Sequence, residues 1–168
     1  MASINITEYK MAVLRDLFNN PEIVTLIDSQ DEGFNRDEPD SLIYRNIWPY
    51  LRIPDTITVS DCHILIAVDI TAPSRYNPTY AKYLTTIWCL CHQERMRVGT
   101  RTGTRIDLLS EEVKKMFDGE MKFGFGEYQL LSNREIILNE KFQYRELKFE
   151  CNDLRHKVTP EGKRHRQD

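Results

Sequence analysis

The sequence predicts a single α+β domain in which amphipathic helices cover one sheet of about four to five strands, mainly antiparallel or mixed. Three observations support this fold class: a helical apolar stripe in residues 105–118, alternating apolar and polar residues on both sides of it, and an apolar content of 40% in 168 residues. A chain of this length buries a core without disulfides or metals. We therefore expect one domain over residues 1–154.

The clearest element is a helix at residues 105–118. Its apolar residues recur at helical spacing, and they are Ile106, Leu109, Val113, Met116 and Phe117. Thr104 and Asp107 are expected to cap the first turn, and Gly119 is expected to end the helix in a left-handed conformation. An isolated helix of this length is marginal in water. Its stripe must therefore be covered, and we expect a sheet to cover it.

Two short helices and an extended arm precede the expected sheet. Residues 6–18 and 22–27 show helical periodicity on either side of Pro21, which predicts a helical hairpin within residues 1–27. Residues 41–61 contain two prolines and many apolar and aromatic side chains. Because so much apolar area is unusual in a free linker, we expect an ordered arm that crosses the surface of the domain or of a neighbour.

The sheet is expected to come from residues 62–154. Residues 63–70 form a nearly continuous apolar run, which is typical of a strand covered on both faces, and residues 80–92 alternate as a longer strand. Further strands are predicted at residues 127–132, 136–138 and 145–151. Residues 155–168 are polar and basic, and we expect a disordered tail.

Charge is distributed unevenly along the chain, whose net charge is -3. Residues 1–61 carry 5 basic and 11 acidic side chains, whereas residues 155–168 carry 5 basic and 2 acidic ones. Such asymmetry suits contacts between unlike surfaces. No run approaches the roughly 18 apolar residues that span a bilayer, and residues 1–7 lack the pattern of a secretory signal. We therefore expect no membrane contact.

No pattern in the sequence predicts a catalytic residue, a cofactor or a bound metal. The cysteines Cys62, Cys89, Cys91 and Cys151 lie in apolar or alternating runs, which indicates buried reduced thiols that serve packing. The cysteines at 62, 89 and 91, with His63 and His92, are zinc-binding residue types, but their spacing is not C-x-x-C and neighbours on a strand point to opposite faces. The arginine-rich loop of residues 93–103 lacks a P-loop lysine.

Five segments of the middle and C-terminal half share the pattern and order of a known family. They are IYRNIWPYLRIPDT, HILIAVDI, TRIDLLSEEVKKMFDG, FGFGEYQLLSN and YRELKFECNDL, within residues 42–154. Together they resemble the small neck proteins of tailed bacteriophages, the tail-terminator and head–tail connector group. The resemblance implies a non-catalytic α+β subunit, assembled in the bacterial host cytoplasm as a virion ring of six or twelve copies. It also implies contacts with adjacent neck, tail-tube and connector proteins, and transient contact with DNA.

A ring needs a heterologous interface, in which one patch of a subunit meets a different patch of the next. We hypothesise that the acidic segment of residues 28–40, the arginine loop and the aromatic arm supply these patches. The candidate interface residues are Asp31, Glu32, Asp37, Tyr44, Trp48, Tyr50, Arg95, Arg97, Arg101 and Arg105. Reversing the charge of the arginines should then weaken assembly and leave the monomer folded.

Two alternatives come from other functional classes. Asp55, Glu146 and Lys148 supply the letters of a restriction-type nuclease motif, which would make the chain a phage-encoded metal-dependent nuclease. Against this, Asp55 lies in the proline-rich arm, about ninety residues from the other two. The second alternative is an adaptor domain whose sheet edge or arm binds one unrelated partner.

Overall fold

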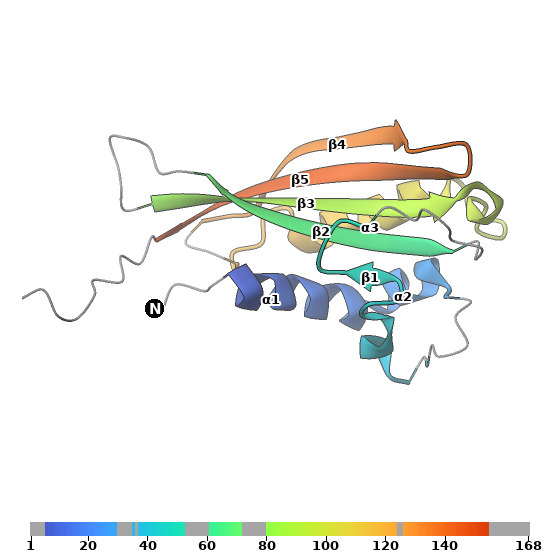
Figure 1. Cartoon of the computed structure of the whole chain (residues 1–168), viewed down its shortest axis with the longest axis horizontal. Helices are drawn as coiled ribbons and strands as arrows, with labels where there is room; N and C mark the ends of the chain where they lie inside the picture. Colours follow the sequence, from blue (N-terminus) through green and yellow to red (C-terminus); the bar gives the residue numbers. More distant parts are fainter. Residues whose placement is uncertain are drawn as a thin grey trace, which may run out of the picture.

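The structure is a computed structural model that describes residues 6–29, 35, 37–52, 61–71, 80–123 and 126–154. Helices pack on a five-stranded mixed sheet with the strand order β1-β2-β3-β5-β4 (Figure 1). The predicted α+β class is therefore confirmed. The expectations for the tail of residues 155–168 and for Asp31, Glu32 and Asp55 lie outside the described residues.

The predicted helical hairpin is present as α1 (Ile6–Asn19) and α2 (Pro21–Ile27). Asn20 caps α2, because its side chain accepts hydrogen bonds from the N–H groups of Glu22 and Ile23 at 2.9 and 3.2 Å. The proline that opens α2 loses nothing there, since the first N–H groups of a helix have no partner within it.

The third helix, α3 (Arg105–Phe117), begins and ends where the sequence predicts. The N–H of Asp107 donates to the Thr104 hydroxyl at 3.2 Å, and the N–H of Thr104 donates to the Asp107 carboxylate at 3.2 Å. These two bonds form the expected capping box. Gly119 follows with φ +84°, a conformation that favours glycine. Both ends of α3 are therefore fixed by local sequence.

The sheet contains β1 (Ile47–Trp48), β2 (Cys62–Thr71), β3 (Tyr80–His92), β4 (Gln129–Ile137) and β5 (Phe142–Leu154). β1 runs parallel to β2, and the other neighbouring pairs are antiparallel. The two strands predicted at residues 127–132 and 136–138 are one strand, because residues 133–135 stay in register with β5. Polar residues between two apolar runs suggest a break, but an edge strand tolerates them.

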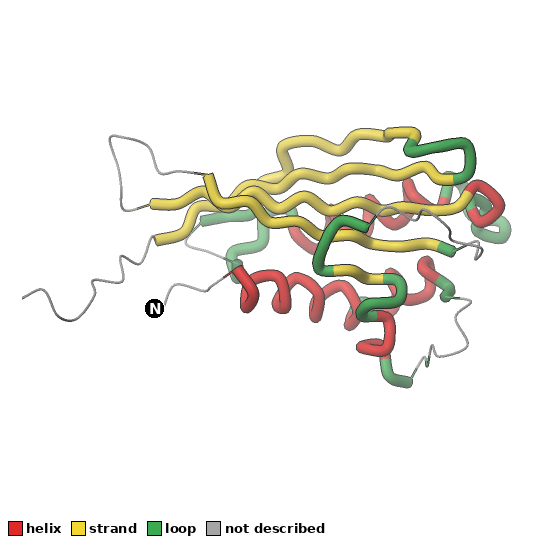
Figure 2. Tube along the Cα trace, in the orientation of Figure 1, coloured by secondary structure: helices red, strands yellow, loops and turns green. Residues whose placement is uncertain are grey.

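The arm of residues 41–61 is ordered as far as Arg52, and residues 53–60 lie outside the described part. It contains a 3-10 helix, η1 (Pro39–Leu42), and then β1, which forms one edge of the sheet. After β1 the chain crosses in front of β2 (Figures 1 and 2). The expectation of an arm across the domain surface therefore holds for its described part.

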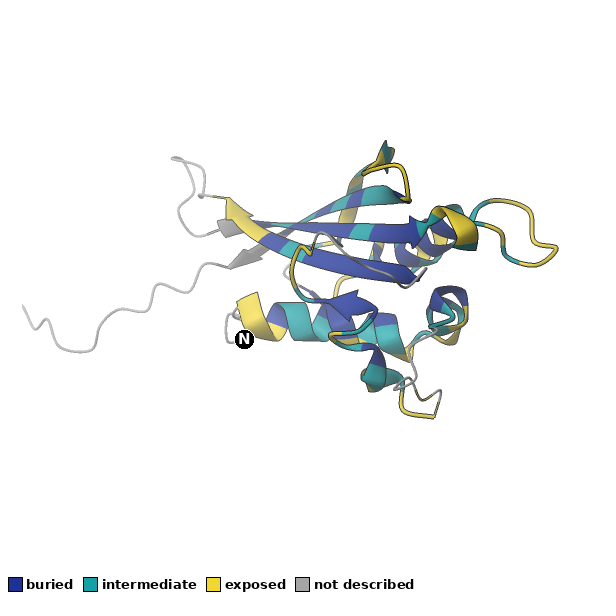
Figure 3. Cartoon of the chain, turned by 45° about the vertical axis from the view of Figure 1, so that its right-hand side comes forward, coloured by how far each residue is buried: buried dark blue, intermediate teal, exposed yellow. Residues whose placement is uncertain are grey.

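The hydrophobic core lies between the sheet and the helices, and buried positions concentrate there (Figure 3). β3 alternates as predicted, with Tyr83, Thr85, Ile87, Cys89 and Cys91 all buried. Apolar residues of α1, α2 and α3 cover this face of the sheet. No helix formed by the described residues is both long and apolar enough to cross a membrane.

Three buried hydroxyl groups join α1 to the sheet. The Tyr9 hydroxyl lies 3.0 Å from the Thr85 hydroxyl and also contacts the Tyr128 hydroxyl, which donates to Thr85 at 2.5 Å. Desolvation raises the pKa of both tyrosines above the ordinary value. Each hydroxyl therefore stays neutral and hydrogen-bonded, and the cluster serves the fold rather than chemistry.

Candidate functional site

One face of the sheet is not covered by any helix of the described residues. Figures 1 and 2 show this face in front, with α3 behind the strands. Strand residues alternate between the two faces, so the residues opposite the core form rows across the strands. One row runs from β1 to β4 through Trp48, Leu65, Trp88, Glu146 and Arg134. The helix-free face therefore begins apolar and aromatic and becomes charged toward β4.

A groove of about 230 Å³ lies on this face. It is lined by Leu51, Arg52, Leu65, Trp88, Leu90, Leu138, Tyr144 and Glu146. Leu51 and Arg52 come from the arm, and Leu138 comes from the turn between β4 and β5. Strand residues complete the lining between them. A mainly apolar hollow with few polar groups is typical of a surface that receives a partner's side chains.

Glu146 is the acidic group of the groove. Its carboxylate accepts a hydrogen bond from the indole N–H of Trp88 at 3.2 Å and pairs with Lys148 at 3.1 Å. Desolvation, with the Glu146 charge as a smaller cause, raises the pKa of Tyr144 above its ordinary value. Both glutamate contacts lie within the sheet, so they fix its orientation beside the apolar lining.

An aromatic ridge, which we define as Tyr44, Trp48 and Tyr50, lies at the β1 edge. The ring centroids of Trp48 lie 6.2 Å from Tyr44 and 5.6 Å from Tyr50, and both contacts are edge-to-face. The Arg52 guanidinium lies 4.3 Å from the Trp48 ring centroid, which is a cation–π distance. Trp48 is buried, whereas Tyr44 and Tyr50 are exposed. The predicted interface residues of the arm thus form one cluster that presents two tyrosines.

Tyr44 adopts a left-handed backbone conformation, with φ 61°. Few residues other than glycine, asparagine and aspartate adopt it readily, so a tyrosine there carries a backbone cost. The N–H of Tyr44 donates to the C=O of Ile47 at 2.9 Å, which holds this turn against β1. Since the turn leaves the tyrosine ring exposed, its strain suits a side chain displayed for contact.

The opposite edge of the sheet is β4, and no other strand of the described residues pairs with its outer side. Leu131 and Ile137 on this strand are exposed, as is Leu138 just after it. A β-bulge separates Leu130 from Ser132. The sequence analysis did not include these apolar residues among the interface candidates. Their signal was available, because an apolar residue in a strand that alternates against a covered face must point outward.

The arginine loop is tied to the hairpin of the same chain. Arg95 donates to the carboxylate and to the C=O of Asp28, both at 2.8 Å, and Arg101 pairs with Glu22. The hydrogen bond and charge of Glu22 raise the pKa of Arg101. Two of the predicted interface arginines therefore have acidic partners within the subunit.

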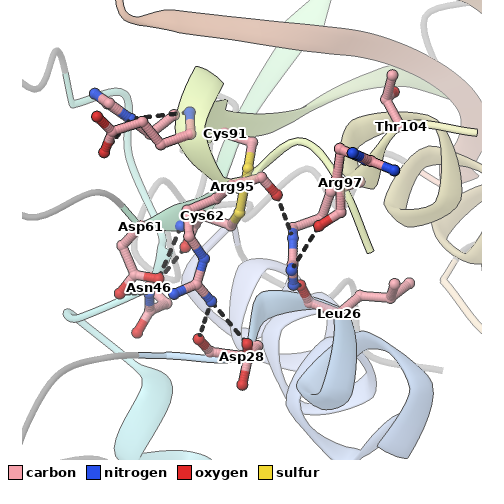
Figure 4. The surroundings of a disulfide bond; sticks show 12 residues. Leu26, Asp28, Asn46, Asp61, Cys62, Cys91, Arg95, Arg97 and Thr104 are labelled. Carbon is pink, nitrogen blue, oxygen red and sulfur yellow. Dashed lines mark hydrogen bonds and ion pairs between the residues drawn. A yellow bond between two sulfur atoms is a disulfide. The ribbon is translucent and has the colours of Figure 1, made fainter. Parts of the chain in front are cut away.

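Arg105 is buried and belongs to the interior of the subunit. Its guanidinium donates to the C=O groups of Arg95 at 2.7 Å, Leu26 at 2.5 Å and Arg97 at 3.4 Å (Figure 4). Desolvation, followed by the charge of Arg95, lowers its pKa. Arg105 thus links α2, the arginine loop and α3. Of the predicted candidates outside the arm, the structure leaves Arg97 and Asp37 exposed.

The cysteine prediction is wrong for two of the four residues, because Cys62 and Cys91 form a disulfide (Figure 4). They are direct partners in the β2–β3 register, with Cα atoms 4.2 Å apart. The N–H of His92 donates to the C=O of Asp61 at 3.2 Å, so the next pair along is a closely spaced pair without hydrogen bonds. Cys89 and Cys151 are free and buried, and burial raises the pKa of the Cys89 thiol to about 12.

The other residues considered for metal chemistry are dispersed. His63 is buried on the face opposite Cys62, where burial lowers its pKa and the Asp61 charge opposes this effect. Glu146 and Lys148 pair with each other on the helix-free face. Within the described ranges, no group of three or more His, Cys, Asp or Glu side chains is placed to hold a metal ion.

The chain was compared with known proteins once this geometry was established. A family model named YomW matches residues 20–151, which include every described strand except the end of β5. YomW is a phage-region protein of Bacillus, so the match agrees with the phage association that the resemblance implies. No curated protein matches the chain. Because the family model covers most of the sequence, the chain belongs to the YomW family.

Proposed function

We propose that the protein is a structural virion component that forms a ring at the head–tail interface of a tailed phage. In this role it terminates the tail or joins it to the channel of the head. The phage association of the YomW family supports the proposal. The observation that carries it is the helix-free sheet face, whose apolar groove lies between exposed apolar residues of the arm and of the β4–β5 turn.

This surface suits assembly because exposed apolar area of this kind marks protein contacts. A ring of six or twelve copies would use one set of these residues for its own contacts. The groove then remains for an adjacent neck, tail-tube or connector protein. Arg97 and Asp37 are proposed as polar contacts at the rim, where charge steers association more than it adds affinity.

The first test is the mass and shape of the purified full chain. Light scattering after size-exclusion chromatography and negative-stain imaging should show a closed annulus with a central hole. A monomer at high concentration would contradict the proposal. The same preparation should leave DNA intact in the presence of magnesium or manganese. Cleavage that Glu146→Ala abolishes would support the nuclease alternative.

The second test separates the two neck roles in a phage that lacks this gene. Loss of a tail terminator should give tails of uncontrolled length. Loss of a connector should give filled heads and separate tails of normal length. Supplying the gene in trans should restore infectious particles, and mass spectrometry of those particles should detect the protein. Particles without the protein would exclude a virion role.

A further inference from the structure

Six exposed large apolar residues lie along two opposite edges of the sheet. Tyr44, Tyr50 and Leu51 lie at the β1 edge, and Leu131, Ile137 and Leu138 lie at the β4 edge or just beyond it. The sheet is five strands wide, and at roughly 4.8 Å per strand spacing its edges are about 19 Å apart. Two separated apolar strips on opposite sides of a subunit are what a head-to-tail contact between copies requires.

The β4 edge offers main-chain groups as well as apolar side chains. The N–H of Leu138 donates to the C=O of Phe142 at 3.1 Å, and bonding alternates along an antiparallel ladder. Asn133, Glu135 and Ile137 therefore direct their N–H and C=O groups away from β5. No described strand pairs with them there. At the other end of the edge, the Asp118 carboxylate already accepts the N–H of Leu130 at 3.0 Å.

Charge argues against pairing of β4 with β4 of a second copy. Two antiparallel copies of one strand are related by a two-fold axis, so residues equally distant from the axis lie opposite each other. An axis at Arg134 or Glu135 places like charges directly opposite, which is destabilising. An axis at Asn133 or Ile136 places Glu135 opposite the apolar Leu131 or Ile137. The β4 edge thus disfavours its own copy and suits a different surface.

The β1 edge provides such a surface. Its ridge presents two tyrosines, and Arg52 adds a positive charge over Trp48. On the β4 side, Glu135 is half exposed and lies 3.5 Å from Arg145, which already binds Asp107 at 2.5 Å. Glu135 is therefore the weaker partner of Arg145 and complements an incoming cation. Arg134 on the same strand lies opposite Glu146 in the sheet, which offsets its charge.

We infer that the β4 edge of one copy binds the aromatic ridge of the next copy. This contact is heterologous, so each copy uses one edge for each neighbour. The inference rests on the proposed ring and specifies its subunit interface. It also assigns the predicted arm residues Tyr44 and Tyr50 to a defined partner surface, which is the strip of Leu131, Glu135 and Ile137.

The test uses two variants of the full chain. An edge variant carries Leu131→Asp and Ile137→Asp, at side chains that are 53% and 71% exposed. A ridge variant carries Tyr44→Asn and Tyr50→Ser, because asparagine tolerates the left-handed backbone at position 44. A control variant carries Ile6→Asp and Met121→Asp, which are 40% and 62% exposed and lie on neither strip. Circular dichroism and thermal unfolding check that each variant folds.

Each variant alone should be a monomer of 19.9 kDa, whereas wild type and the control should form rings. Mixing the edge and ridge variants one to one leaves a single intact contact, between the ridge of the first and the β4 edge of the second. The mixture should therefore form a species of two chains and nothing larger. Light scattering after chromatography measures each mass.

The outcomes separate the interface from the ring itself. Wild-type rings that persist in folded edge and ridge variants would leave the proposed function standing and overturn the interface. Dimers of the ridge variant alone would show β4–β4 pairing and would also overturn it. A monomeric wild type would overturn the proposed ring, and the inference with it.

Discussion

The indole N–H of Trp88 donates to the carboxylate of Glu146 across the β3–β5 pair, at 3.2 Å, on the helix-free face of the sheet. A hydrogen bond to a charged acceptor is stronger than one between neutral groups. The bond keeps a carboxylate against an apolar groove without leaving it unpaired. It also brings Glu146 close enough to contribute to the raised pKa of Tyr144.

The first prediction concerns this pair. Trp88→Phe removes the donor and should lower the free energy of unfolding by about 1–2 kcal/mol, because Glu146 keeps only Lys148 as a partner. Glu146→Gln keeps an acceptor for the indole and should cost less. It should also lower the pKa of Tyr144 toward its ordinary value. Urea unfolding and an ultraviolet titration of the tyrosines measure the two effects. Equal stability of Trp88→Phe and wild type would contradict the assigned bond.

The second prediction concerns Arg105. Arg105→Met leaves the C=O groups of Leu26, Arg95 and Arg97 without their donor and should destabilise the fold by about 3 kcal/mol. Arg97→Met is the matched control, because Arg97 is exposed and contributes only its backbone here. It should change the unfolding free energy by less than about 0.5 kcal/mol. Similar losses in both variants would show that Arg105 has no special structural role.

The third prediction is a pH dependence from Asp107. Burial raises its pKa, but hydrogen bonds from Thr104 and Arg145 outweigh this effect, and the net pKa is lowered. A lowered pKa means that the charged form stabilises the folded state. This contribution is complete above about pH 4 and disappears as the pH falls through the folded pKa. Asp107→Asn should cost about 1 kcal/mol at pH 7 and much less near pH 2. A cost independent of pH would argue that only the cap geometry matters.

The fourth prediction concerns His63, whose pKa burial lowers. The unfolded chain then binds the proton more readily than the folded one, so stability falls as the pH drops below about 6.5 and levels off below the folded pKa. Asp61 and Arg52 are the charged groups that act on the ring, with opposite signs. His63→Gln should flatten the stability profile between pH 7 and 5 relative to wild type. An unchanged slope would assign the effect to another group.

The helices and the central strands could be predicted because their signals are local. Thr104, Asp107 and Gly119 mark the ends of α3, and Asn20 with the following proline marks the start of α2. The continuity of β4 could not be predicted in this way. Residues 133–135 are polar, and only their pairing with β5 keeps them in a strand. Pairing of distant strands is not encoded by local propensity.

The candidate site was predicted in part, for a similar reason. The aromatic arm was recognised from composition, but its partner surface on β4 depends on which strand lies at the edge. The arginines were expected to meet a neighbour, whereas Arg95 and Arg101 bind Asp28 and Glu22 of their own chain. Charge counts give unlike surfaces but not their separation. The Cys62–Cys91 pair likewise depends on the β2–β3 register, which no spacing rule supplies.

The Cys62–Cys91 bond gives this domain two stabilities, one for each redox environment. The bond joins residues 29 apart in sequence, and chain-entropy reasoning assigns such a closure about 3.5 kcal/mol. Reduced subunits would then open and exchange more readily than oxidised ones. The same fold would be most adaptable where thiols are kept reduced and most durable where they are not.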